Sequence, residues 1–190
     1  MWLDAAYDLL VSDGIDAVKV MPLAKRLGLT RTGFYWHFKD VPELHKAIID
    51  LWKNRNTGVM VRKCAQPADS LCEALFNLID CWIDPDLFDA ALDLAIRNWA
   101  RTDPDLQTLV DASDEQRLGA VTDLFIRFGT APDIAHYRAL TAILTQTGYY
   151  SMRITEPRAK RAEAGCRYVE VFAGVRPNTA DTDAFLARHR

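Results

Sequence analysis

The stretch from Arg31 to Lys39, RTGFYWHFK, concentrates side chains that could contact DNA. The guanidinium of Arg31 is suited to a guanine edge or a phosphate, and Thr32 is suited to contact with a thymine methyl group. Gly33 would let the backbone of a helix approach a DNA groove closely. These three neighbouring residues therefore indicate the start of a DNA-reading helix.

The run from Phe34 to Phe38 contains five consecutive aromatic residues. They cannot all face inward from one helix, because successive helical residues point about 100° apart. Phe34 and Phe38 are four residues apart and share one face, which we expect to be the inner one. Tyr35, His37 and Lys39 would then present hydroxyl, imidazole and ammonium groups to phosphate oxygens. Aromatic runs are more often core than binding surface, so a purely structural role remains open at this point.

Two helices and a turn are needed to present these side chains. Pro22 is suited to open the first helix, and Gly28 to end it in a left-handed conformation that turns the chain sharply. We expect Leu29 to fill the corner and the Thr30 hydroxyl to cap the next helix. This arrangement, with the small Ala24 four residues before the glycine, predicts a helix-turn-helix.

Apolar residues recur at helical spacing along almost the whole chain, and strand-like alternation is nearly absent. The sequence therefore predicts an all-α protein with an N-terminal three-helix helix-turn-helix domain and a C-terminal helical bundle. The expected helices, about nine, span residues 2 to 13, 22 to 28, 31 to 37, 41 to 63, 68 to 83, 86 to 101, 104 to 129, 132 to 153 and 157 to 173. The tail from Val175 to Arg190 is expected to be only partly ordered, with a short amphipathic piece.

The first three helices are too short to hold a core alone and must lean on the helix that begins near Val41. We therefore place the domain boundary within or just after that helix, where Gly58 and Pro67 loosen the apolar pattern. This divides the chain into residues 1–52 and residues 53–190.

Composition limits the classes of function. The chain has 23 Lys and Arg against 26 Asp and Glu, so any DNA binding must be local. The four cysteines form no CxxC pair and are expected to be reduced thiols. The N-terminus does not fit a signal peptide, and no apolar run approaches the roughly 18 residues of a membrane span, so we expect a cytoplasmic protein without a membrane partner. The sequence has no nucleophile elbow, HExxH, phosphate loop or paired ExxH motif, and we predict no enzyme activity, no cofactor and no metal site.

Several spaced motifs agree over roughly the first fifty residues: Asp13-Gly14-Ile15 after the first helix, Leu23-Ala24 and Leu27-Gly28-Leu29 around the turn, the Phe34 to Phe38 block, and Glu43-Leu44 in the fourth helix. Together they closely resemble the DNA-binding region of the TetR family of bacterial transcriptional regulators. The resemblance implies a homodimeric repressor whose N-terminal helices bind operator DNA and whose C-terminal helices form a ligand pocket and the dimer interface. Residues 1–52 would then be the DNA-binding domain, and residues 53–190 the ligand-binding and dimerisation domain.

The resemblance also assigns roles position by position. Thr30 to Gly33 would begin the recognition helix, Tyr35 and Trp36 would lie at the groove or backbone, and His37 and Lys39 would approach phosphate. The predicted DNA-contact residues are Thr30, Arg31, Thr32, Gly33, Tyr35, Trp36, His37 and Lys39.

Two departures from the family pattern lower the expected affinity for DNA. Val41 stands where many members have a lysine, and the sequence begins at Met1-Trp2 without the basic residues that often precede the first helix. Residues 1 to 60 carry eight Lys or Arg against seven Asp or Glu. We expect few phosphate contacts, and a slope of log K against log salt no steeper than about −8 per dimer.

The C-terminal part is rich in aromatic residues, which typically line pockets for small molecules together with a few polar groups. No cluster of charges converges at helical spacing, so we expect an apolar or aromatic effector. Asn77, Arg97, Asn98 and His136 are further polar candidates, each more typical of a surface or packing role. The predicted ligand-binding residues are Phe76, Trp82, Trp99, Phe125, Gln146 and Tyr149.

The last two long helices carry stripes of small and apolar residues that suit close helix packing in a homodimer: Ala135, Ala139 and Ala142, and then Ala159, Ala162, Cys166, Val169 and Ala173. A two-fold dimer requires a near-palindromic operator with half-sites about one helical turn, or a multiple, apart. The alternative is a helical dimer that binds a ligand or a protein and has weak or lost DNA binding, as the near-neutral N-terminal region suggests.

Overall fold

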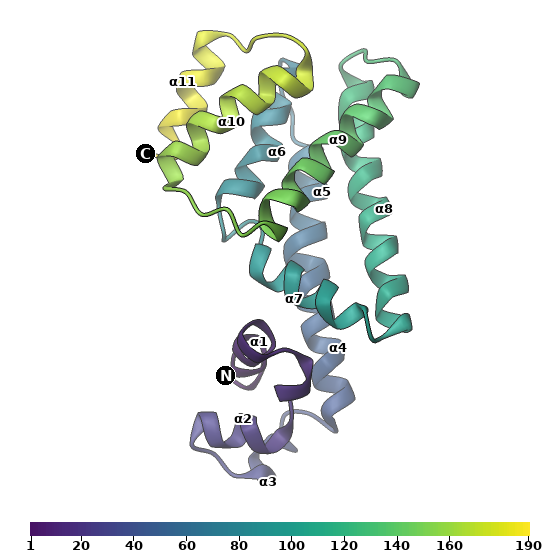
Figure 1. Ribbon diagram of the computed structural model, residues 1–190, viewed down its shortest axis with the longest axis vertical. Helices are drawn as coiled ribbons and strands as arrows, with labels where there is room; N and C mark the ends of the chain where they lie inside the picture. Colours follow the sequence, from purple (N-terminus) through teal and green to yellow (C-terminus); the bar gives the residue numbers. More distant parts are fainter. The chain divides into compact units, whose positions relative to one another are not determined.

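The computed structural model describes residues 1–190 and contains helices and connecting loops but no strand (Figure 1). This confirms the predicted all-α class. The elements are α1 Trp2–Asp13, a 3₁₀ turn Ile15–Ala17, α2 Val20–Leu27, α3 Arg31–Phe34, α4 Val41–Trp52, a π-helical turn Lys53–Gly58, α5 Val59–Cys64, α6 Leu71–Ile83, α7 Ala90–Ala100, α8 Pro104–Arg127, α9 Pro132–Ser151, α10 Arg158–Ala173 and α11 Thr179–Ala187. None of these helices combines the length and the apolar character that crossing a bilayer requires.

The chain forms two compact units. The first contains Met1–Asn56 and Asp89–Ala112, and the second contains Thr57–Phe88 and Ser113–Arg190. The division therefore passes through the π-helical turn, through the loop before α7 and through α8. It differs from a simple cut after residue 52, because a later segment of the chain returns to the first unit.

The core of the first unit forms where α1, α2, α3 and α4 meet α7. The buried residues of the first four helices include Leu10, Leu23, Phe34 and Leu44, and α7 adds the fully buried Leu92. α7 contacts both α1 and α4. The three short N-terminal helices therefore gain their stability from α7 as well as from α4.

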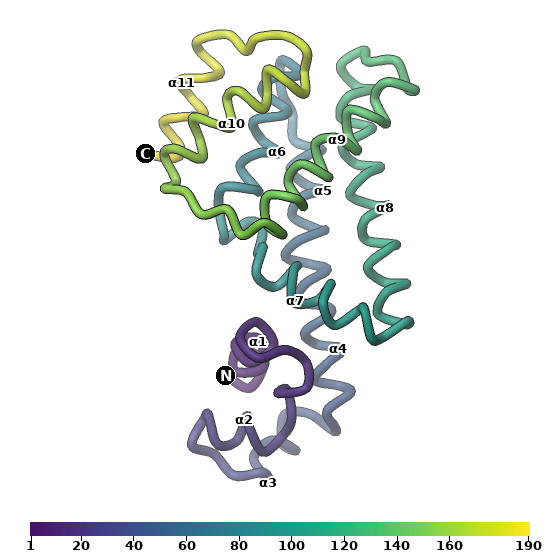
Figure 2. The backbone as a smooth tube through the Cα atoms, viewed as in Figure 1, coloured from purple at the N-terminus to yellow at the C-terminus, as the bar shows by residue number.

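The second unit is built around α6, which is buried along almost its whole length. It contacts α5, α10 and α11, and it lies beside α10 in the backbone trace (Figure 2). Gly165 of α10 allows this close approach, because an added Cβ would come within 3.1 Å of the Ile79 side chain and 3.2 Å of the Phe185 ring.

The C-terminal tail is more ordered than the sequence suggested. Residues Thr179–Ala187 form α11, capped by the Asn178 side chain. The fully buried Phe185 stacks on Phe76 at 4.4 Å between ring centroids, and His189 Nε2 lies 2.9 Å from Asp80 Oδ1. The expectation of partial order was wrong because these contacts reach more than 100 residues back along the chain.

Candidate functional site

The turn between α2 and α3 is fixed by local backbone chemistry. Gly28 adopts the left-handed conformation, with φ 64° and ψ 27°, as predicted. This lets the Leu29 amide donate to the Ala24 carbonyl at 2.9 Å and closes the end of α2. Thr30 Oγ1 accepts a hydrogen bond from the Gly33 amide at 3.3 Å, so the predicted cap of α3 is confirmed. Leu29 is 40% exposed and does not fill the corner as we expected.

The aromatic run divides between core and surface, as the helical spacing predicts. Phe34 is completely buried, with its ring 5.5 Å from Trp2 edge to face and 5.6 Å from Phe38 in a stacked arrangement. Tyr35 is 47% exposed and Trp36 is 85% exposed. The inner pair anchors α3, and the outer residues are free to contact another molecule.

α3 is shorter than predicted, because the regular helix ends at Phe34 and the next residues form turns. The Tyr35 and His37 amides each donate to a carbonyl three residues earlier, at 3.2 and 2.9 Å. Phe38 still donates to the Phe34 carbonyl at 3.0 Å, so one helical turn separates the two inner rings. The segment therefore presents its outer side chains from a tight, capped turn.

Arg31 and Tyr35 form a preorganised pair on this surface. An Arg31 Nη donates to the Tyr35 hydroxyl at 3.3 Å, and the guanidinium lies 5.8 Å from the centre of the Tyr35 ring. Thr30, Thr32, His37 and Lys39 are also exposed, and Gly33 is half-buried. The structure thus brings all eight predicted DNA-contact residues onto or beside one short surface segment, which we call the α3 surface.

Asp40 and Glu43, which follow the α3 surface in the sequence, are engaged with backbone amides, and Asp8 of α1 is engaged with an arginine. Asp40 Oδ1 accepts from the Glu43 amide at 2.9 Å and caps α4. Glu43 Oε2 accepts from the Lys39 amide at 2.5 Å. Asp8 pairs with Arg26 of α2 at 3.0 Å. The side chains of the α3 surface form no ion pair, so their positive charge is available to an anion.

Comparison with protein families decides what kind of domain this is. Residues 3–48 match the model of the bacterial regulatory proteins of the tetR family. This segment is therefore similar to the N-terminal domain of the TetR family. The matched segment contains the complete α2–α3 turn and the α3 surface.

Solved structures extend the TetR-like fold to the whole chain. AmtR of Mycobacterium smegmatis superimposes with a TM-score of 0.66 at 16% identity, covering 98% of this chain and 91% of that chain. A transcriptional regulator of Rhodococcus sp. Rha1 superimposes with a TM-score of 0.60 at 19% identity, covering 99% of this chain and 93% of that chain. A protein described as a TetR-family transcriptional regulator, from Mesorhizobium loti MAFF303099, gives 0.62 at 18% identity, with 98% and 94% covered. Comparison with curated proteins found no match.

A small cavity lies in the second unit, among α6, α9 and α10. It brings together three of the six predicted ligand residues, Trp82, Gln146 and Tyr149. Its space for the centre of a water molecule is about 10 Å³, enough for a single water. The remaining lining residues are Ile79, Ala142, Thr145, Arg161, Gly165, Tyr168 and Phe172.

The other three predicted ligand residues lie elsewhere. Phe76 stacks on Phe185 in the core of the second unit, and Phe125 is completely buried in that unit. Trp99 belongs to the first unit, where its ring lies 5.0 Å from His45. The sequence did not single out Arg161, which also lines the cavity.

Buried polar residues mark the places where the chain passes from one unit to the other. In the first unit, the side-chain amide of Asn56 donates to the backbone carbonyl of Asp89 at 2.8 Å. The backbone amide of Asp89 in turn donates to Asn56 Oδ1 at 3.1 Å. In the second unit, Arg117 Nε donates to Thr57 Oγ1 at 2.9 Å, and the guanidinium lies 5.4 Å from the centre of the Phe88 ring. Within each unit, segments far apart in sequence are therefore joined next to the crossings.

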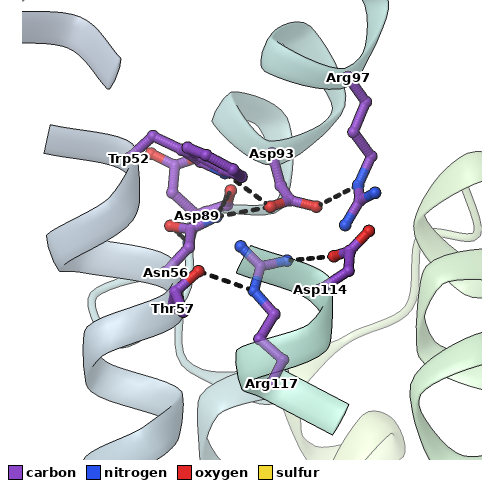
Figure 3. A network of polar contacts seen from close by, with 8 residues as sticks. All are labelled: Trp52, Asn56, Thr57, Asp89, Asp93, Arg97, Asp114 and Arg117. Carbon is purple, nitrogen blue, oxygen red and sulfur yellow. Dashed lines mark hydrogen bonds and ion pairs between the residues drawn. The ribbon is translucent and has the colours of Figure 1, made fainter. Parts of the chain in front are cut away.

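The carboxylate of Asp93 accepts hydrogen bonds from other side chains of the first unit (Figure 3). Trp52 Nε1 donates to Asp93 Oδ1 at 2.7 Å, and Arg97 Nε donates to Asp93 Oδ2 at 2.9 Å. Trp52 is the last residue of α4, and Asp93 lies in the first turn of α7. Arg97, considered from the sequence as a ligand group, therefore has a structural role in this pairing.

Most residues of the small-residue stripes of α9 and α10 face the interior of the chain, whereas Ala159 is exposed and Cys166 is half-buried. Ala135, Ala139, Ala142, Ala162 and Val169 are buried in the isolated chain. These five residues pack within the unit and are not on its surface. The exposed apolar residues of the same two helices are Ile134, Tyr137, Leu144 and Val171.

Proposed function

We propose that this chain is a transcriptional repressor, acting in the cytoplasm, that binds a palindromic operator as a homodimer and responds to a small effector with an aromatic or apolar body. The observation that carries the proposal is the α3 surface. It combines an exposed Trp36 with the Arg31–Tyr35 pair at the end of a capped turn. Side chains of these types supply base-edge and phosphate contacts in DNA complexes.

The α3 surface is well suited to a duplex because local contacts hold it in place. Phe34 and Phe38 hold it from the inside, and Thr30 and Asp40 cap the helices on either side. A preorganised surface loses little side-chain and loop entropy on binding. Its few basic groups account for the modest salt dependence expected from the sequence.

The exposed apolar residues of α9 and α10 are suited to bind a second copy of this chain. Tyr137 and Val171 are 66% and 70% exposed, and they line one groove with Ile134 and the buried Phe172. An exposed apolar patch on adjoining helices typically marks an interface. A two-fold contact through these helices would place two α3 surfaces in symmetric positions, as a palindromic operator requires.

Regulation would work by a shift of population between two arrangements of the chain. An effector that favours one packing of the second-unit helices would act through the three points where the chain crosses into the first unit, which include the π-helical turn. π-helical turns are often found at functional positions. The first unit would respond as one body, because α7 and α4 are joined through Asp93 and Trp52.

Binding-site selection from random duplex DNA with the purified full chain tests the proposal. We expect enrichment of a near-palindrome with half-sites about one helical turn, or a multiple, apart. The selection should be made at two salt concentrations, because non-specific binding weakens steeply with salt. Lack of enrichment by protein shown to be folded and dimeric would contradict the proposal and favour a ligand-binding or protein-binding module without an operator.

A further inference from the structure

The cavity among α6, α9 and α10 contains two buried hydrogen-bond donors that have no acceptor. They are Nε2 of Gln146 and Nη1 of Arg161. Buried polar groups in folded proteins almost always have a partner, and leaving one unpaired costs free energy. Two such donors in one cavity therefore favour an acceptor, either a water molecule or a polar group of a ligand, between them.

The orientation of the Gln146 amide is fixed by its neighbour. Gln146 is 7% exposed, and its Oε1 accepts from Arg161 Nη2 at 2.7 Å. A flipped amide would place its NH₂ group against the guanidinium, donor against donor, so the oxygen must face Arg161. The NH₂ group is thereby turned away from Arg161 and has no acceptor of its own.

The guanidinium of Arg161 forms no direct ion pair, although the Glu156 carboxylate is close enough to interact with it electrostatically. The guanidinium stacks on the Tyr149 ring at 3.3 Å from the ring centre and shares one hydrogen bond with Gln146. Glu156, the nearby carboxylate, accepts from the Tyr149 hydroxyl and pairs with Lys160 at 3.1 Å. A partly buried cation without a direct ion pair is costly, so the cavity favours an acceptor that carries negative charge.

The remaining walls define the body of the ligand. Trp82, Tyr149 and Tyr168 provide aromatic faces, and Ile79, Ala142 and Phe172 provide apolar ones. One guanidinium and one amide match the two oxygens of a single carboxylate, whereas a doubly charged phosphate would need more donors.

We propose that this cavity is the effector site and that the effector is a monocarboxylate with an aromatic body, held by Arg161 and Gln146. This rests on the proposed function, since it names the chemical class of the effector. The present volume admits one water, so the ligand enters only as the helices around the cavity separate. Binding therefore selects a more open packing of α9 and α10 against α6.

The test uses the full chain without DNA and a matched set of probes: benzoate, phenylacetate and 3-phenylpropanoate, each beside its neutral amide. Calorimetric titration and thermal unfolding should show binding and stabilisation by at least one carboxylate and much less by its amide. Arg161→Met should weaken that binding by roughly 10- to 100-fold, the effect of losing a charged hydrogen bond. Arg167→Met, an exposed arginine on the same helix, is the matched control and should leave binding unchanged.

A second variant remains informative if Arg161→Met does not fold. Gln146→Glu places a carboxylate beside Arg161 and should abolish binding of the probes while the fold is kept. The proposal is overturned if no carboxylate binds the folded wild-type chain, or if binding survives both variants. It is also overturned if no probe binds the wild-type chain and Arg161→Met separates the dimer. The two donors would then hydrogen-bond to the partner chain and not to an effector. The operator selection is made without any probe. A failure of the DNA-binding proposal is therefore distinguished from a failure of the effector-site proposal.

Discussion

The divided aromatic run predicts opposite effects for two alanine substitutions only two residues apart. Phe34→Ala removes a completely buried ring that contacts Trp2 and Phe38. Truncating a buried phenylalanine typically costs about 3–5 kcal/mol, which includes aromatic contacts worth roughly 0.5–1.5 kcal/mol each. Trp36→Ala removes a side chain that is 85% exposed, so the free energy of unfolding should change by less than about 0.5 kcal/mol.

Urea unfolding followed by circular dichroism measures the first effect, and fluorescence anisotropy with a selected operator measures the second. Trp36→Ala should keep the wild-type unfolding midpoint and lose about tenfold or more in DNA affinity, equivalent to ~1.4 kcal/mol. Met152→Ala, which truncates another exposed apolar residue, is the matched control and should change neither quantity. Equal destabilisation by Phe34→Ala and Trp36→Ala, or unchanged DNA affinity in Trp36→Ala, would refute the division of the run into core and binding surface.

Three further predictions concern stability and assembly. Trp52→Phe removes the 2.7 Å hydrogen bond to Asp93 and should lower the free energy of unfolding in urea by about 1.5–3 kcal/mol; no change would show that this bond contributes little. Burial and the hydrogen bond to Asp89 raise the pKa of Tyr7 to about 12, so the folded state holds this proton more tightly than the unfolded state. The stabilisation from Tyr7 should be complete below about pH 10 and be lost as the pH rises towards 12, and Tyr7→Phe should unfold with a flatter pH dependence there; an identical pH dependence would be inconsistent with the raised pKa. Val171→Asp places a charge in the exposed apolar patch of α10 and should convert the dimer to a folded monomer in sedimentation velocity; a dimer of unchanged stability would place the interface elsewhere.

The local features of the DNA-binding turn could be predicted from the sequence because each depends on neighbouring residues. Gly28 is one of the few residues that adopts a left-handed conformation without cost, and Thr30 can cap only the helix that follows it. The spacing of Phe34 and Phe38 places both on one helical face whatever surrounds them. The length of α3 was overestimated, because the helical pattern does not reveal where turns replace the regular helix.

Contacts between distant segments could not be predicted in the same way. Trp99 was assigned to the ligand pocket because it lies in an aromatic-rich region of the sequence, yet α7 carries it into the first unit beside His45. Arg161 was missed because an arginine on a helix is usually solvated, and its relation to Gln146 depends on how α10 packs against α9. The stripes of small residues did indicate close helix packing, and most of their residues pack within the chain.

The most direct test of the central claim is the affinity of a triple variant for the selected operator. Arg31→Ala, Thr32→Ala and Tyr35→Ala together remove the polar contacts of the α3 surface and leave the Phe34 core in place. The account predicts an operator affinity at least about 100-fold weaker, equivalent to ~2.7 kcal/mol, with an unchanged urea midpoint. Arg176→Ala, which removes an exposed arginine of the second unit, should bind as the wild type does. Wild-type affinity in the triple variant would contradict the assignment of DNA recognition to the α3 surface.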